Sequence, residues 1–175
     1  MNRLGHIGFA LLAGTGTSAL LGLSFFPTVW LCAIAASFST LPDIDLHWQS
    51  GHRGGTHSLA FMFAIGLAVG TTVLLAVACI FPHILPYIAP YFPSAAGIRI
   101  SSSLAFAAGF APVVIGIGSH LLADLLTYRG TPLLWPSDKK KYSLRMFKSD
   151  SAMNVIFGLT GFILFLALIF TLLPP

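Results

Sequence analysis

The sequence predicts an all-α bundle of helices that crosses a membrane several times. Hydrophobic residues make up 56% of the 175 residues and charged residues only 8%, which is too few charges to solvate a soluble globular surface. The mean hydropathy is +0.88. A bilayer accepts an apolar exterior, and helices satisfy their own backbone hydrogen bonds inside it. We therefore expect residues 1–175 to form a single integral-membrane domain.

Four long apolar segments are each close to the roughly 20 residues that a spanning helix needs. They cover residues 7–26, 57–81, 102–127 and 153–173. A fifth segment, residues 28–42, is shorter and contains Ser37, Ser39 and Thr40, so we expect a short or tilted span there. Pro27 fits a helix start in the turn between the first two segments. The pattern predicts about five transmembrane helices, one of them short.

Basic residues gather on one side of the membrane when five such spans alternate in direction. Eight of the nine Lys and Arg residues then lie on the side of the N-terminus, and only Arg99 lies on the other. Loops rich in Lys and Arg mark the cytoplasmic side of a membrane protein. We therefore expect a multi-pass protein of the inner (plasma) membrane with a cytoplasmic N-terminus.

The formal net charge of +4 does not indicate a nucleic-acid partner. The basic residues are not interleaved with aromatic residues on a polar surface, as single-strand binding requires. The run Lys139–Lys141 is explained as a topological anchor that also attracts anionic lipid headgroups. The sequence contains no P-loop, dinucleotide fingerprint, Ser nucleophile elbow or CxxC pair.

Residues that can bind a metal ion converge on the predicted cytoplasmic side. They are His6, Asp43, Asp45, His47, His52, His57, His120 and Asp124. Only His83 lies on the opposite side. The topology was derived from Lys and Arg alone, so this convergence is a separate observation. His6 can also be an interfacial or capping residue, and His47 can form an interfacial pair with Trp48.

His120 and Asp124 are four positions apart and share one face of a helix. A charged Asp in a membrane segment costs roughly 2.5–3.5 kcal/mol on insertion-based scales, so it should face protein, water or a cation. A metal ion would compensate this charge. The structural alternative is a hydrogen-bonded His–Asp pair that joins two helices.

Asp43 and Asp45 follow Pro42 at the end of a predicted span. Carboxylates two residues apart can hold one hard cation or bridge two. Such a pair is weak evidence by itself, because Asp is also common in turns and helix caps.

The segment 52–58, HRGGTHS, combines flexible glycines with ionisable side chains. Thr56 can cap the following helix, which places His57 in its first turn. The planar guanidinium of Arg53 suits a phosphate or an oxyanion. Alternatively, Arg53 is only one of the positive charges that fix the topology.

Taken in order, LPDID (41–45), HRGGTHS (52–58), SHLLADLLT (119–127) and GTPLLWP (130–136) resemble the membrane-bound metal-dependent hydrolase family of bacterial and archaeal inner-membrane proteins. The resemblance extends from His6 to about Leu144. It implies a hydrolase with His and Asp metal ligands and leaves the substrate open. These ligands fall on His6, Asp43, Asp45, His57, His120 and Asp124. Family members often carry a Glu where the last span begins, whereas this chain has no Glu and places Asn154 in that region.

The residues and the resemblance together predict hydrolysis of an ester or phosphoester in a lipid or lipid-linked substrate. One or two divalent ions, Zn or Mn given the mixed nitrogen and oxygen donors, would activate water and polarise the scissile bond. Asp45 or Asp43 would act as the general base, and Arg53 would hold the developing negative charge. A divalent-cation transporter or channel and a non-enzymatic scaffold stapled by metal are the alternatives. The one-sided cluster favours a site over a pore, and the oligomeric state stays open.

Overall fold

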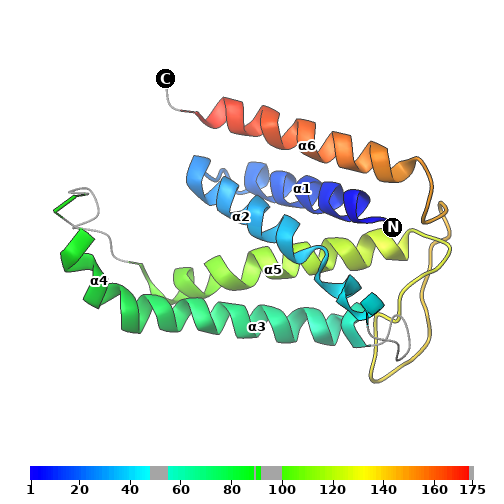
Figure 1. Ribbon diagram of the computed structural model, residues 1–175, viewed down its shortest axis with the longest axis horizontal. Coiled ribbons are helices and arrows are strands. Elements are labelled where there is room, and N and C mark those ends of the chain that lie inside the picture. Colours follow the sequence, from blue (N-terminus) through cyan, green and yellow to red (C-terminus); the bar gives the residue numbers. More distant parts are fainter. Residues whose placement is uncertain (48–54, 89, 92–99, 174–175) are drawn as a thin grey trace.

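The computed structural model describes residues 1–47, 55–88, 90–91 and 100–173, and every regular element in those ranges is a helix (Figure 1). The all-α prediction is therefore confirmed. In chain order the elements are α1 (Arg3–Leu20), α2 (Phe25–Phe38), η1 (Leu41–His47), η2 (Gly55–His57), α3 (Leu59–Leu75), η3 (Ala76–Ile80), α4 (Phe81–Ile88), α5 (Ser102–Leu125) and α6 (Met153–Leu172). Elements η1 and η2 are 3-10 helices, and η3 is a π-helix.

Within the described ranges, four helical segments are long and apolar enough to cross a membrane. They are Phe25–Ile44, Leu59–Tyr87, Ser102–Leu125 and Met153–Leu172. The first of them contains the segment 28–42, which we expected to be short. It reaches 20 residues because η1 follows α2 closely and lengthens the span. The four segments and the all-helical architecture agree with a polytopic membrane bundle.

Helix α1 corresponds to the first predicted span but differs from it in its limits. It covers Arg3–Leu20 rather than 7–26, because the Asn2 side chain caps its start and Gly22, at a φ of +60°, ends it in a left-handed turn. It is not among the four candidate spans, since Arg3 and His6 lower the hydropathy of its first two turns. Helix α1 nevertheless lies inside the bundle, in contact with α2, α5 and α6.

The five long helices alternate in direction (Figure 1). Helices α1, α3 and α6 start at the same end of the bundle at which α2 and α5 finish, the right-hand end of Figure 1. Elements η1 and η2 and the connection 126–152 lie at this end too. We call it the polar end, because the metal-ligating residues predicted from the sequence come from these segments.

The outward faces of the bundle are apolar. Phe63 and Leu67 on α3 and Leu159 and Phe162 on α6 are each about half exposed. Exposing so many large apolar side chains to water is energetically unfavourable, whereas lipid tails solvate them at no cost. The side chains therefore agree with the membrane spans.

Glycines let the helices approach one another closely. A Cβ added to Gly8 of α1 would collide with the backbone of Phe157 and Gly158 in α6, and one added to Gly161 would collide with the Gly8 backbone. Between α2 and α5, a Cβ on Gly116 would collide with the Ala35 carbonyl. In a bilayer such small residues drive association, because lipid competes with larger apolar side chains.

The contact between α1 and α6 leads to a stability prediction. Replacing Gly8 with Ala should push α1 away from α6 and lower the free energy of unfolding by about 1–3 kcal/mol, the usual cost of overpacking. Gly16→Ala is the matched control, because no atom lies within 4 Å of a Cβ at that position of the same helix. Thermal unfolding in detergent measures both variants, and equal midpoints for the two would contradict the packing argument.

Candidate metal centre

Five ionisable side chains from four elements meet at the polar end. They are His6 of α1, Asp43 of η1, His57 of η2, and His120 and Asp124 of α5. The side chains of His6, His57, His120 and Asp124 are fully buried, whereas the Asp43 side chain is 25% exposed. Two overlapping groups of donors result, one around Asp43 and one around His6.

Two carboxylate oxygens, from Asp43 and Asp124, each lie close to the same pair of imidazole nitrogens. The Nε2 atoms of His57 and His120 are 3.3 Å apart. Asp43 Oδ1 lies 3.5 Å from the first of these nitrogens and 3.7 Å from the second. Asp124 Oδ2 lies 3.8 and 3.7 Å from the same two nitrogens. In a tetrahedral zinc site with bonds of about 2.0–2.1 Å, donor atoms are about 3.4 Å apart. Each carboxylate oxygen therefore forms, with the two imidazole nitrogens, a triangle with the spacing of three ligands of one tetrahedral divalent ion.

Hydrogen bonds hold both imidazoles so that Nε2 faces the two carboxylates. The Nδ1 atom of His120 lies 2.6 Å from the Ser39 carbonyl oxygen, which can only accept, so Nδ1 carries the proton and Nε2 a lone pair. The Nδ1 atom of His57 lies 3.1 Å from the Thr56 hydroxyl, which is compatible with the same tautomer. Backbone carbonyls and hydroxyls orient metal-binding histidines in this way.

Asp124 joins the two groups of donors. Its Oδ2 faces His57 and His120, whereas its Oδ1 lies 3.6 Å from His6 Nε2 and 2.6 Å from the Met1 amino group. The cations and donors around it compensate a carboxylate that is completely buried. Asp124 is thus placed to bridge the Asp43 group and the His6 group.

His6 lacks the hydrogen bonds that a buried imidazole usually makes. Its ring is fully buried and stacks on His120 with 3.7 Å between the ring centres, and neither of its nitrogens has a hydrogen-bond partner among the described residues. A buried polar atom without a partner is costly. A metal ion would give one of these nitrogens the partner that it lacks, so His6 fits a ligand of a second ion or of a shared one.

The donor set as a whole fits a divalent cation. Imidazole nitrogens and carboxylate oxygens without thiolates suit Zn²⁺ or Mn²⁺ better than Mg²⁺ or Ca²⁺, which prefer oxygen alone. The buried His6, His57, His120, Asp43 and Asp124 cluster could bind a metal ion.

The structure brings together five of the six metal ligands predicted from the sequence, and the sixth cannot be compared. Asp45 belongs to η1, but its side chain lies outside the described part, and so does that of His47. Arg53 and His52 fall in residues 48–54, which are also outside the described residues. His83 lies in α4 at the opposite end of the bundle, as expected.

Asn154, at the position where a Glu was expected from the resemblance, has a structural role. It is 3% exposed, accepts a 3.0 Å hydrogen bond from the Asn2 backbone N–H, and donates to the carbonyls of Ser149 and Ser151 at 2.9 and 3.0 Å. These bonds join the start of α1 to the start of α6. Asn154 therefore positions the chain that leads to His6 rather than contributing a ligand.

The connection 126–152 supports the site in a way that we did not predict. The Thr131 hydroxyl donates to the His57 carbonyl at 3.0 Å, and the Leu59 N–H donates to the Leu133 carbonyl at 2.9 Å. The Trp135 ring packs on Gly55, where a Cβ would come within 2.7 Å of it. The motifs HRGGTHS and GTPLLWP therefore contact each other around His57. Side chain to backbone bonds of this kind leave no periodic pattern in a sequence.

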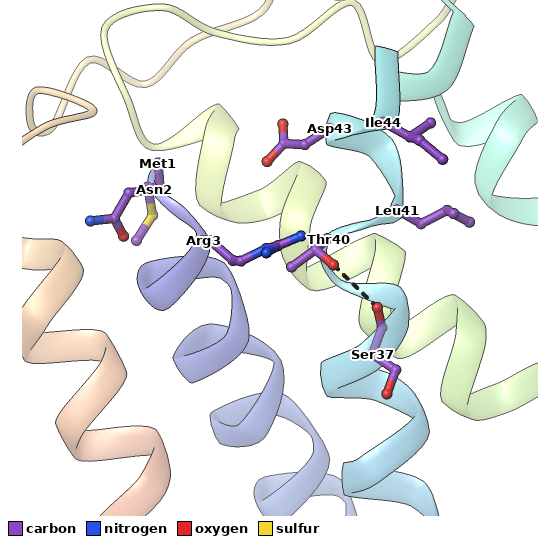
Figure 2. A pocket seen from close by; sticks show the side chains of 8 residues that line it. All are labelled: Met1, Asn2, Arg3, Ser37, Thr40, Leu41, Asp43 and Ile44. Atoms are coloured by element: carbon purple, nitrogen blue, oxygen red, sulfur yellow. Dashed lines mark hydrogen bonds between the residues drawn. The ribbon is translucent and has the colours of Figure 1, made fainter. Parts of the chain in front are cut away.

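A cavity of about 480 Å³ adjoins the cluster (Figure 2). Its lining comes from the start of α1, the end of α2 and η1: Met1, Asn2, Arg3, Ser37, Thr40, Leu41, Asp43 and Ile44. Asp43 is the member of the cluster that lines it. The cavity therefore leads from the surface to the exposed side of the Asp43 carboxylate, and the other ligands lie behind it.

Comparison with known proteins places the chain in a family. No curated protein and no solved structure matches it. The family model described as YdjM inner membrane protein matches residues 1–173, which is almost the whole chain. The description agrees with the four candidate spans and supports an inner-membrane location. The chain therefore belongs to the YdjM inner membrane protein family.

Proposed function

We propose that this protein is a membrane-embedded metal-dependent hydrolase that cleaves an ester or phosphoester bond in a lipid or lipid-linked substrate. The observation that carries the proposal is the pair of imidazole nitrogens of His57 and His120, 3.3 Å apart, each with a carboxylate oxygen of Asp43 and of Asp124 at 3.5–3.8 Å. Three of these side chains are fully buried, and the fourth faces a cavity. A closed structural metal site would not need that opening.

The charge distribution supports a cytoplasmic position for the polar end. Arg3 lies there, and so does the connection 126–152, which contains Arg129, Lys139, Lys140, Lys141, Arg145 and Lys148. Basic residues of this kind are retained on the cytoplasmic side. The site then acts at the level of the lipid headgroups of the inner leaflet, with the N-terminus inside.

Six residues have a proposed role in this chemistry. When bound, a divalent cation supplies Lewis acidity and activates water for attack on the scissile bond. His57, His120 and Asp124 would hold it, and Asp43 would be a further ligand. The exposed side of the Asp43 carboxylate is placed to accept the proton of the attacking water as a general base. Asp45 is the alternative base, and Arg53 would stabilise the negative charge that develops.

The position of the ionisable groups favours an enzyme site over a cation path. Among the described residues, the buried His and Asp side chains all belong to the polar end, and the buried polar groups of the other half are hydroxyls or a thiol, such as Thr15, Ser18, Thr28 and Cys32. A path for a divalent cation requires charged or coordinating groups along the membrane.

Metal binding is the first test. Elemental analysis of detergent-purified protein should find a divalent metal, and His57→Ala or Asp124→Asn should lower its content about 10-fold or more, because each change removes a ligand. His83→Ala is the control, since His83 is exposed in α4 at the other end of the bundle. Full metal content in both ligand variants, at the stability of the wild type, would contradict the site.

Hydrolysis is the second test. The metal-loaded protein should hydrolyse at least one member of a panel of phosphoesters, carboxylesters and phospholipids, and a chelator should abolish that activity until Zn²⁺ or Mn²⁺ is restored. Asp43→Asn should lower kcat by roughly 10²–10⁴-fold, the usual contribution of a general base. Bound metal without hydrolysis of any of these substrates would refute the enzyme and favour the scaffold.

A further inference from the structure

We propose that Arg3 and the cavity beside Asp43 bind the phosphate group of the substrate. The inference rests on the proposed function for the bond that is cleaved, but it concerns a different part of the molecule. It assigns an anion-binding role to an arginine outside the four motifs LPDID, HRGGTHS, SHLLADLLT and GTPLLWP, and it narrows the substrate class to phosphate-bearing molecules.

The cavity has the size and position of a substrate site. Its volume of about 480 Å³ lies within the roughly 300–1,000 Å³ typical of small-molecule pockets. It is located where helices begin and end, at the polar end of the bundle, and it contacts the cluster through Asp43. A molecule that fills it therefore has one end against the metal cluster.

Arg3 supplies the positive charge of this cavity. Its side chain extends from the first turn of α1 toward Thr40 (Figure 2). Arg3 is exposed, and no described residue forms an ion pair or a hydrogen bond with its guanidinium. The first turn of α1 contains no acidic residue either, so the positive end of the helix dipole adds to the charge of Arg3.

The other polar groups of the cavity leave Arg3 as its principal donor. The Ser37 hydroxyl donates to the Ala33 carbonyl at 2.8 Å, and the Thr40 hydroxyl donates to the Ser37 carbonyl at 3.4 Å. The Met1 amino group donates to Asp124. The guanidinium therefore offers an entering anion a charged donor whose planar fork matches two oxygens of a phosphate.

The apolar part of the lining suits a substrate with both a charged and an apolar portion. Leu41 and Ile44 of η1 line the cavity, and Ile44 is about half exposed. A phosphate held by Arg3 would leave the neighbouring ester bond close to Asp43. A phospholipid headgroup and a soluble organic phosphate share this chemistry, so the test must separate the two sources.

Isothermal titration of the detergent-solubilised, metal-loaded protein tests the subsite. The probes are dihexanoyl phosphatidic acid and inorganic phosphate. We expect Arg3→Gln to raise the Kd for the probe that binds by about 10- to 100-fold, because the charge-assisted hydrogen bonds are lost. Arg3→Lys, which keeps the charge but not the fork, should have an intermediate effect. Arg129→Gln is the control, because it removes an exposed arginine that does not line the cavity.

The outcomes separate the subsite from the enzyme. Unchanged affinity in Arg3→Gln, or an equal loss in Arg129→Gln, would overturn the subsite. Tighter binding of phosphatidic acid than of inorganic phosphate identifies a lipid ligand, and equal binding with the same dependence on Arg3 identifies a soluble one.

Elemental analysis of the same samples tests the metal site independently of the titration. If the purified protein contains no metal but its affinity for phosphate still depends on Arg3, the subsite stands and the proposed hydrolase is refuted. If its metal content depends on His57 but its affinity for phosphate does not depend on Arg3, the metal site stands and the subsite is refuted. If the Arg3→Gln variant unfolds, the Kd of the probe for Arg3→Lys, compared with that for the wild type, tests the subsite instead.

Discussion

The carboxylate of Asp124 is a buried charge inside an apolar bundle, and the polar end is arranged around it. An isolated Asp in a membrane helix costs roughly 2.5–3.5 kcal/mol. Asp124 avoids that cost because His6, His57, His120 and the Met1 amino group all lie within 3.8 Å of its oxygens. The histidines belong to α1, η2 and α5, and Met1 precedes α1. Compensation of the Asp124 charge therefore requires that α1, η2 and α5 meet at the same end of the bundle.

Glycine contacts make this meeting geometrically feasible. Gly116 of α5 packs on the backbone of Ala35 in α2, and one helical turn further along each helix His120 contacts the Ser39 carbonyl. Gly8 packs on α6 two residues after His6 in the same way. Close backbone approach thus fixes the level of each helix relative to its neighbour. The ligands then need no long side chains to reach a common point, and imidazole and short carboxylate groups suffice.

The sequence was sufficient to predict the helical bundle and its polar end, because apolar length and the positions of charged residues are local properties. The shared face of His120 and Asp124 also follows from their spacing alone. The hydrogen bonds that hold the ligands in place do not follow from residue spacing. The bonds from Thr131 to His57 and from Asn2 to Asn154 join residues 74 and 152 positions apart, and each involves a backbone group. The start of α1 at Arg3 was missed for a similar reason, since it depends on the cap formed by Asn2.

Exposure divides the cluster into two functional parts. His6, His57, His120 and Asp124 have no access to solvent, so they can hold an ion but cannot meet a substrate. Asp43 is 25% exposed and lines the cavity that also contains Arg3. For the proposed hydrolase this separation has a physical advantage, because a buried set of ligands keeps its geometry while a single carboxylate at the rim exchanges protons with water. The same separation argues against conduction, since an ion held by this cluster at one end of the bundle has no further described His or Asp donors to move to.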